Sequence, residues 1–140
     1  MSLALRAYHL TVKTRIAAVL LAGVFAFAPA AGAASFRATL TAPTHTPRVN
    51  AKWFYTVRAR DPAGRPIRAA VTVQLVDPIG SLHPVQYDDT KQNIVNRPFN
   101  GAFRDYIKFP SDSKGFKLTV RVTVKAKSSK VVLSYWIRAR

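Results

Sequence analysis

The sequence predicts an all-β domain, an antiparallel β-sandwich of about seven short strands, behind an N-terminal segment for export. Three observations carry this prediction. Apolar and polar residues alternate with a period of two in most segments after residue 35. Turn-forming residues separate these segments at intervals of about ten residues. No stretch of this part has the three-and-four spacing of an amphipathic helix.

The first 33 residues have the three-part layout of a secretory signal. A basic lead that ends at Arg15 precedes an apolar run over residues 16–28, and the small residues Ala31-Gly-Ala33 follow. We expect a signal-peptide helix over residues 1–33, cleavage after Ala33, and a single domain over residues 34–140 that is secreted or extracytoplasmic. The alternative is an uncleaved N-terminal anchor, which would keep the protein at the membrane.

The composition excludes some kinds of site and favours one class of partner. Because the chain has no cysteine, it has no disulfide, thiolate metal site, cysteine nucleophile or lipid-bearing cysteine. It has 22 Lys and Arg against 6 acidic residues, all Asp; without the three basic residues of the predicted signal, 19 against 6 leaves +13. A charge of this size attracts polyanions, although basic residues spread along every segment also serve general solubility.

Four segments show the alternation most clearly, and three others fit it less well. The clear strands are expected at residues 51–60, 68–77, 116–125 and 131–140. The weaker ones are expected at residues 36–41, 103–109 and 83–87. Two facing sheets would bury the inward positions, which in the strand at 116–125 begin with Phe116. The core residues that we expect are Trp53, Tyr55, Val71, Val73, Leu75, Phe103, Ile107, Val120, Val122, Leu133 and Tyr135.

Proline, glycine, aspartate and serine mark the joints between these strands. Turns are expected at residues 61–66, 77–80, 110–115 and 127–130. The last of these turns lies between two alternating segments, which is the pattern of a β-hairpin.

The run from Val57 to Val73 carries a family resemblance. It reads VRARDPAGRPIRAAVTV: a strand, an Asp, a Gly-x-Pro turn that begins at Gly64, an apolar residue and an Ala-x-Val strand. This run resembles the central hairpin of bacterial immunoglobulin-like domains, including small secreted domains of the YtkA-like type. The resemblance implies an immunoglobulin-like β-sandwich and an extracytoplasmic location, but no activity. The Cys…Trp…Cys core of antibody domains is missing, so only the architecture transfers.

Residues with catalytic or metal-binding chemistry are few. His45 and His83 lie near prolines in exposed, turn-like contexts, and with Asp88 and Asp89 they form only a weak candidate for a metal site. The Asp pair is more simply a turn, or a counter-charge for Lys91 and nearby arginines. No nucleophile elbow and no glycine-rich phosphate loop occurs in the sequence. We therefore expect no enzyme, no cofactor and no metal.

The segment over residues 96–106 mixes Asn, Arg and aromatic residues around Gly101. Such mixtures are common on binding surfaces; the alternative is an irregular sheet edge that leads into a strand. Asp105 shares its alternating face with Phe103 and Ile107, so we expect it to be buried. A buried carboxylate needs a partner, and an arginine or backbone amides are the expected ones.

The C-terminal hairpin carries the candidate binding face. Its outward side is expected to combine basic residues with Val132 and Trp136. Such a face can hold anionic glycans or stacked bases, and the same residues also protect an edge strand from aggregation. The candidate residues are Lys117, Arg121, Lys125, Arg138 and Arg140.

These observations favour a non-catalytic secreted or cell-surface module with a structural or interaction role. The alternatives are an extracytoplasmic carrier of a metal or small ligand, and an electrostatic binder of anionic wall polymers. The expected partner is a protein or an anionic polymer of the cell envelope, without specific nucleic-acid binding. Membrane contact is expected only if the signal is uncleaved.

Overall fold

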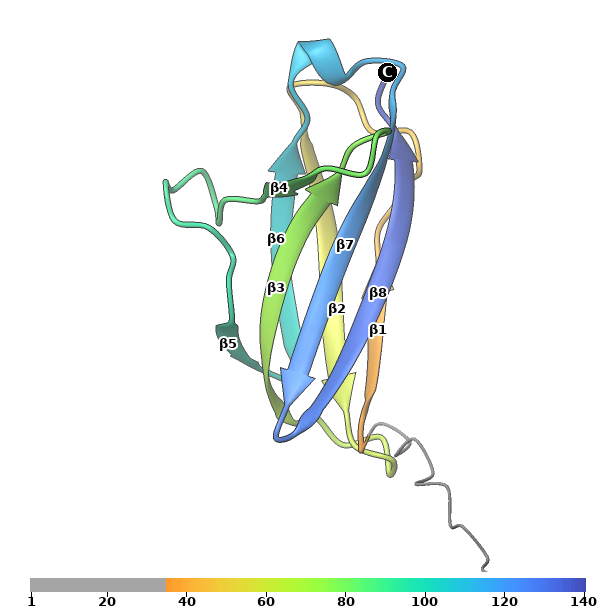
Figure 1. Cartoon of the computed structure of the whole chain (residues 1–140). Helices are drawn as coiled ribbons and strands as arrows, with labels where there is room; N and C mark the ends of the chain where they lie inside the picture. Colours follow the sequence, from red (N-terminus) through yellow and green to blue (C-terminus); the bar gives the residue numbers. More distant parts are fainter. Residues whose placement is uncertain (1–34) are drawn as a thin grey trace, which may run out of the picture. The chain divides into compact units, whose positions relative to one another are not determined.

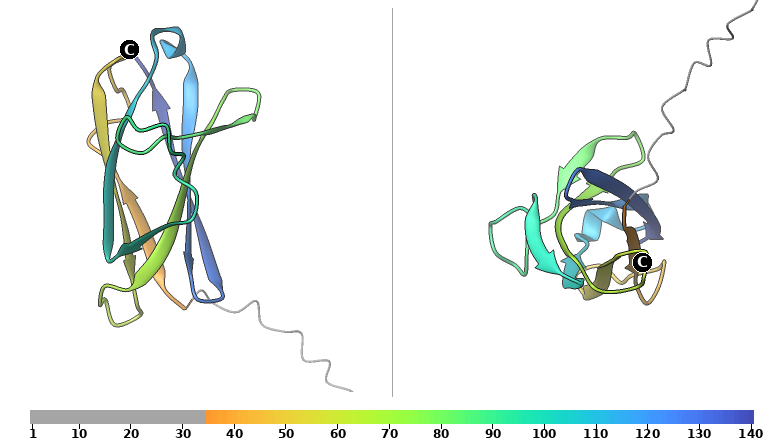
Figure 2. Two further views of the ribbon diagram at one scale, coloured as in Figure 1. Left: turned by 90° about the vertical axis from the view of Figure 1, so that its left-hand side faces the viewer. Right: turned by 90° about the horizontal axis from the view of Figure 1, so that it is seen from below.

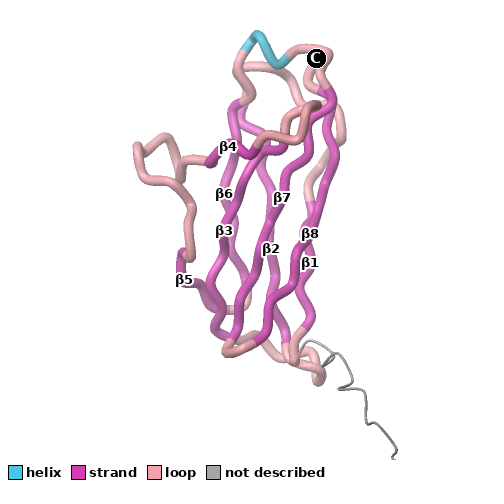
Figure 3. The backbone as a smooth tube through the Cα atoms, in the orientation of Figure 1, coloured by secondary structure: helices cyan, strands magenta, loops and turns pink. Residues whose placement is uncertain are grey.

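The computed structural model describes residues 35–140, which form eight β-strands and one short 3₁₀ turn (Figures 1 and 3). The predicted signal peptide, residues 1–33, lies outside the described residues. Within residues 35–140 there is no α-helix, and the 3₁₀ turn, Ser111–Ser113, lies in the third predicted turn. The strands are β1 (Arg37–Thr41), β2 (Lys52–Arg60), β3 (Arg68–Val76), β4 (Leu82–Pro84), β5 (Arg97–Asn100), β6 (Ala102–Lys108), β7 (Lys117–Ala126) and β8 (Ser129–Arg138).

The strands form two antiparallel sheets that lie as two layers (Figure 2). One sheet has three strands in the order β1-β2-β6. The other has five strands: the order is β4-β3-β7-β8, and β5 also pairs with β3. The prediction of an antiparallel β-sandwich is confirmed, and so is the hairpin of the last two strands, which joins β7 to β8 through the turn at Lys127 and Ser128.

The core lies between the two layers and consists of the inward positions of both sheets. Trp53, Tyr55, Val57 and Ala59 alternate along β2 and are all buried, as the period of two requires. Every predicted core residue belongs to this core or packs against it, with Leu75, Leu133 and Tyr135 only partly buried. Phe116 differs from the prediction: it precedes β7 and is 55% exposed, because the chain is still in the loop there.

The segment that resembles an immunoglobulin-like hairpin connects the two sheets instead of pairing within one. β2 belongs to the three-stranded sheet and β3 to the five-stranded sheet. The two segments pair only next to the turn, where Arg60 lies opposite Pro66. The turn is closed by Asp61, whose carboxylate accepts hydrogen bonds from the backbone amide of Arg65 at 2.9 Å and from its Nε at 2.8 Å.

The structure has eight strands where about seven were expected, because residues 96–106 form two. β5 joins the five-stranded sheet and β6 joins the three-stranded one, and Gly101 lies between them. Gly101 has a φ of +69°, and a Cβ on it would lie 2.6 Å from the Cβ of Pro66. Its backbone groups bond to Ala59 and Ile67 at 2.9 Å. The expected irregular edge is therefore a crossing between the sheets at which only glycine fits.

Candidate functional site

The alternation of β7 and β8 places their basic side chains on the outer face of the five-stranded sheet. Val122 and its even-numbered neighbours in β7 are buried, so the odd-numbered residues point outward. In the register of the hairpin, Lys117 lies opposite Arg138, and Lys125 lies opposite Lys130. We call this surface the hairpin face; its basic residues are Lys117, Arg121, Lys125, Lys130 and Arg138.

The structure brings four of the five predicted candidate residues together on the hairpin face. Lys117, Lys125 and Arg138 are exposed, and Arg121 is half-buried opposite Ser134. The fifth candidate, Arg140, lies beyond the end of β8. Its backbone amide donates to the carbonyl of Pro47 at 2.9 Å, and its carbonyl accepts from Val49 at 3.0 Å. These bonds tie Arg140 to the segment between β1 and β2 rather than to the hairpin.

Lys130 belongs to the hairpin face but was absent from the predicted candidates. Its place follows from the two-residue turn, which sets Ala126 opposite Ser129 and therefore Lys125 opposite Lys130. The signal was present in the sequence, since a short turn between two alternating segments fixes the register of a hairpin.

Trp136 is 48% exposed on the hairpin face and is supported by His45. The His45 ring stacks at 4.1 Å on Tyr135 and at 4.2 Å on Trp136, and its Nδ1 donates to the carbonyl of Trp136 at 2.6 Å. The Nζ of Lys117 lies 5.8 Å from the centre of the Trp136 ring. His45 lies in a bend, as the turn-like context predicted, but it is half-buried rather than exposed, because it covers the end of β8.

Like charges face each other directly across the hairpin. Lys117 with Arg138 and Lys125 with Lys130 are opposite pairs, and none of the six Asp residues lies in β7 or β8. Directly opposite like charges destabilise a sheet. Within residues 35–140, no ion pair involves a residue of the hairpin face. The surface therefore presents uncompensated positive charge.

A second basic surface covers the outside of the three-stranded sheet. Its residues were not among the predicted candidates, although the alternation of residues 51–60 already put Lys52, Arg58 and Arg60 on one side. All of its cations are exposed. We call this surface the three-strand face; its basic residues are Arg37, Lys52, Arg58, Arg60, Arg104 and Lys108.

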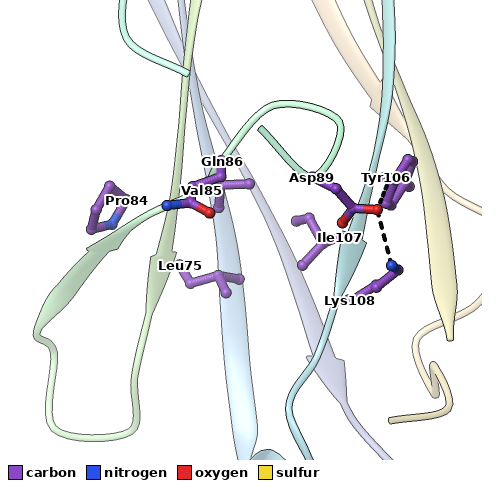
Figure 4. A pocket seen from close by; sticks show the side chains of 8 residues that line it. All are labelled: Leu75, Pro84, Val85, Gln86, Asp89, Tyr106, Ile107 and Lys108. Atoms are coloured by element: carbon purple, nitrogen blue, oxygen red, sulfur yellow. Dashed lines mark hydrogen bonds and ion pairs between the residues drawn. The ribbon is translucent and has the colours of Figure 1, made fainter. Parts of the chain in front are cut away.

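A small pocket opens between the β3–β4 hairpin and β6 (Figure 4). Leu75, Val85 and Ile107 line it together with the polar end formed by Asp89 and Lys108. Its volume of about 230 Å³ is below the roughly 300–1,000 Å³ of typical ligand pockets. The pocket is therefore a poor candidate for a small-ligand site.

The carboxylate at this pocket is already occupied by its neighbours. Asp89 accepts hydrogen bonds from the hydroxyl of Tyr106 and from the Nζ of Lys108, the latter at 2.9 Å. The Tyr106 hydroxyl, and then Lys108, hold the pKa of Asp89 below its ordinary value, while Asp89 raises the pKa of Tyr106. The Asp pair was expected to form a turn or to balance Lys91 and nearby arginines. Asp88 and Asp89 do lie in a turn, and the partner of Asp89 is Lys108, which the fold brings close from β6.

In the part of the chain that the structure describes, neither histidine belongs to a group of three or more side chains that could hold a metal ion. His83 lies in β4, and its Nε2 is 3.0 Å from the Oδ2 of Asp77. This hydrogen bond is the main reason that the pKa of Asp77 lies below its ordinary value. His45 packs against β8 instead, so the two histidines serve separate local structures.

Asp105 is buried, as its alternation with Phe103 and Ile107 predicts, at 4% exposure. Its Oδ2 has no hydrogen-bond partner, and the hydroxyl of Tyr55, its opposite residue in β2, has none either. Burial raises the pKa of Asp105, and backbone amides and the charge of Arg97 oppose the shift. The expected arginine is therefore near, but it makes no ion pair with Asp105 among the described residues.

Comparisons with known proteins add no relative. No family model matches the chain, and no curated protein is similar to it. Among residues 35–140, no helix is both long enough and apolar enough to span a membrane. The argument for function therefore depends on the surfaces described above.

Proposed function

We propose that this protein is a non-catalytic, extracytoplasmic module with an immunoglobulin-like fold, and that it binds an anionic polymer of the cell envelope through the hairpin face. The observation that carries the proposal is that like charges lie opposite each other at two places in the register of β7 and β8. A sheet that places cations directly opposite each other loses stability. An anionic ligand that bridges the two strands reverses this effect, because its charges attract both cations at once.

The strand order supports the immunoglobulin-like part of the proposal. The first, second and sixth strands form one sheet, and the third, seventh and eighth lie together in the other. In an immunoglobulin sandwich, strands A, B and E share one sheet and strands C, F and G share the other. The strands of this protein have the same distribution, and β4 and β5 come between the equivalents of C and E. The buried Trp53 lies on the second strand, whereas antibody domains carry their core tryptophan on strand C.

The state of the titratable groups supports a non-catalytic role. A general base or nucleophile needs a free carboxylate, imidazole or hydroxyl with a positioned partner. Asp61, Asp77 and Asp89 each accept hydrogen bonds that hold neighbouring loops or side chains in place, and His45 is stacked against β8. The extracytoplasmic location rests on the signal-like layout of residues 1–33.

The experiment that tests this proposal is retention on isolated cell envelopes at two salt concentrations. The Debye length falls from about 10 Å at 0.1 M salt to about 3 Å at 1 M, so retention should be lost at high salt. It should also fall when Arg121, Lys125 and Arg138 are changed together to Gln. The matched control changes Arg48, Lys91 and Lys114 to Gln, which removes the same charge from exposed loops. Retention that resists salt, or that falls equally in both variants, would contradict a specific hairpin face.

A further inference from the structure

The three-strand face has the same arrangement of opposed cations as the hairpin face. Arg37 of β1 lies opposite Arg60 of β2, and at the other end of β2 Lys52 lies opposite Lys108 of β6. From Lys52 to Arg60 the strand spans about 26 Å at 3.3 Å per residue. The cations therefore line a surface long enough to contact several units of a linear polymer.

Aromatic rings hold two of these cations in place. Phe54 and Tyr106 lie opposite each other, with ring centres 5.6 Å apart. The Nζ of Lys52 lies 4.1 Å from the centre of the Tyr106 ring, and the guanidinium of Arg104 lies 5.2 Å from that of Phe54. Cation–π contacts restrict long basic side chains before a ligand arrives, which reduces the entropy that binding loses. Because cations already cover the rings, the face suits a chain of anionic groups better than stacked bases.

Negative charge balances only the Lys52 end of the three-strand face, where Asp89 pairs with Lys108 and its charge also acts on Lys52. Within the described part of the chain, only Lys108 of its six basic residues forms an ion pair, with Asp89. Arg60 donates to the carbonyl of Gly64 at 2.7 Å, which fixes the side chain but leaves its charge unbalanced. The remaining cations are exposed and have no carboxylate within ion-pair distance in residues 35–140.

The two basic faces point away from each other. The side chains between the sheets form the core, so the outward positions of the two sheets lie on opposite sides of the sandwich (Figure 2). We infer that the three-strand face is a second site for a linear polymer that bears phosphate or carboxylate groups, and that one molecule bridges two such chains. This inference rests on the proposed function, because the proposed function already assigns one polymer chain to the hairpin face.

The test uses the whole protein with inorganic polyphosphate as the probe. Calorimetric titration with a short-chain form at low salt should give two bound equivalents per protein. The three-strand variant, with Lys52, Arg58 and Arg104 changed to Gln, should bind one, and so should the hairpin variant with Arg121, Lys125 and Arg138 changed to Gln. With long-chain polyphosphate, bridging should produce strong light scattering that disappears when the polymer is in excess. Both variants should lose this scattering.

The loop variant, with Arg48, Lys91 and Lys114 changed to Gln, is the control for net charge and should keep two equivalents and the scattering. Thermal melting shows whether each variant is folded. If the three-strand variant does not fold, a second variant tests the same face without touching the Phe54 and Tyr106 rings. It changes Arg37, Arg58 and Arg60 to Gln.

The outcomes separate the two proposals. If the wild type binds one equivalent, and the hairpin variant abolishes this binding while the three-strand variant keeps it, bridging is overturned and the proposed function stands. If the wild type binds one equivalent and only the three-strand variant abolishes this binding, both bridging and the assignment of the hairpin face are overturned. Scattering that falls equally in all three variants would mean that net charge alone condenses the polymer, and would also overturn bridging.

Discussion

Asp105 shows how a single buried side chain can make stability depend on pH. Its side chain is packed among apolar residues of β6 and leaves one oxygen without a partner. Burial favours the protonated carboxyl and so raises the pKa of Asp105. Below its ordinary pKa the group is protonated in both the folded and the unfolded chain, and the free energy of unfolding is unaffected. As the pH rises through the raised pKa, folding must bury a charge, and stability falls.

The first prediction is that Asp105→Asn is more stable than the wild type at pH 7, by about 1 kcal/mol or more, because the amide fills the same space without bringing a charge into the buried site. The gain should shrink as the pH falls toward about 4, because the wild-type carboxyl is then protonated and uncharged as well. Melting temperatures at several pH values measure this. Asp112→Asn, in the exposed 3₁₀ turn, serves as the control, and an equal gain at all pH values would contradict the argument.

The second prediction concerns Gly101 and Gly64, which both have positive φ angles, +69° and +82°. The new Cβ of the Gly64→Ala variant has open space around it. This variant should lose about 1–2 kcal/mol of folding stability, mainly because alanine disfavours the left-handed backbone there. The Gly101→Ala variant should lose more folding stability, because its Cβ would lie 2.6 Å from the Cβ of Pro66. Overpacking of this kind adds about 1–3 kcal/mol to the loss. Denaturant unfolding of the two variants gives the comparison, and equal losses would show that the crossing relaxes freely.

At the scale of the element, β7 lies between β3 and β8 in the five-stranded sheet, and its two sides differ strictly in polarity. Its inward valines have no exposed surface, while its outward residues bear charge or hydroxyl groups.

The third prediction is that Val122→Asp prevents folding, because an unpaired carboxylate in the core costs several kcal/mol against a total folding stability of roughly 5–15 kcal/mol. The Arg121→Asp variant should fold, because Arg121, the residue before Val122, points outward. Circular dichroism melting separates them, and equal melting temperatures would mean that the register is wrong.

The fourth prediction tests the opposed cations of the hairpin. Lys125→Glu places a carboxylate opposite Lys130 and should raise stability by about 0.2–1 kcal/mol, since an opposite-charge pair replaces a repulsive one. The same change should weaken retention on cell envelopes. Lys114→Glu, in an exposed loop, changes the charge equally and should not stabilise the hairpin. A variant that gains stability and keeps full retention would show that the opposed cations do not serve binding.

At the scale of the whole molecule, 11 of the 19 Lys and Arg residues that follow residue 34 lie on two surfaces that the core keeps apart. The chain has no glutamate, and the Asp residues that form ion pairs do so at the turn after β2, beside β4 and at β6. Two separated basic surfaces attract anionic chains from both sides, and each can act without the other. This separation is the property that the bridging proposal needs.

The fifth prediction concerns processing of the whole chain. The Ala31-Gly-Ala33 triplet predicts a mature N-terminus at Ala34, with Ser35 as the near alternative. Intact-mass measurement of the exported protein identifies the first residue. A full-length species held in the membrane fraction would instead support an uncleaved anchor.

The sequence by itself determined most of the strands, most of the core and the burial of Asp105, because these follow from a local alternation with a period of two. It also placed four of the five candidate residues on one face, since the hairpin register depends only on a short turn. Residues 57–73 looked like one hairpin, and residues 96–106 like one strand with an irregular edge; both contain crossings between sheets.

Only the tertiary structure decided which strands pair across long stretches of chain, and so which side chains meet. His45 packs against Trp136, which lies 91 residues later in the chain. Asp89, in a turn, meets Lys108 of β6, and the three-strand face forms from β1, β2 and β6. Such meetings depend on how two sheets bury their apolar sides against each other. That packing is a property of the whole chain, and no local pattern contains it.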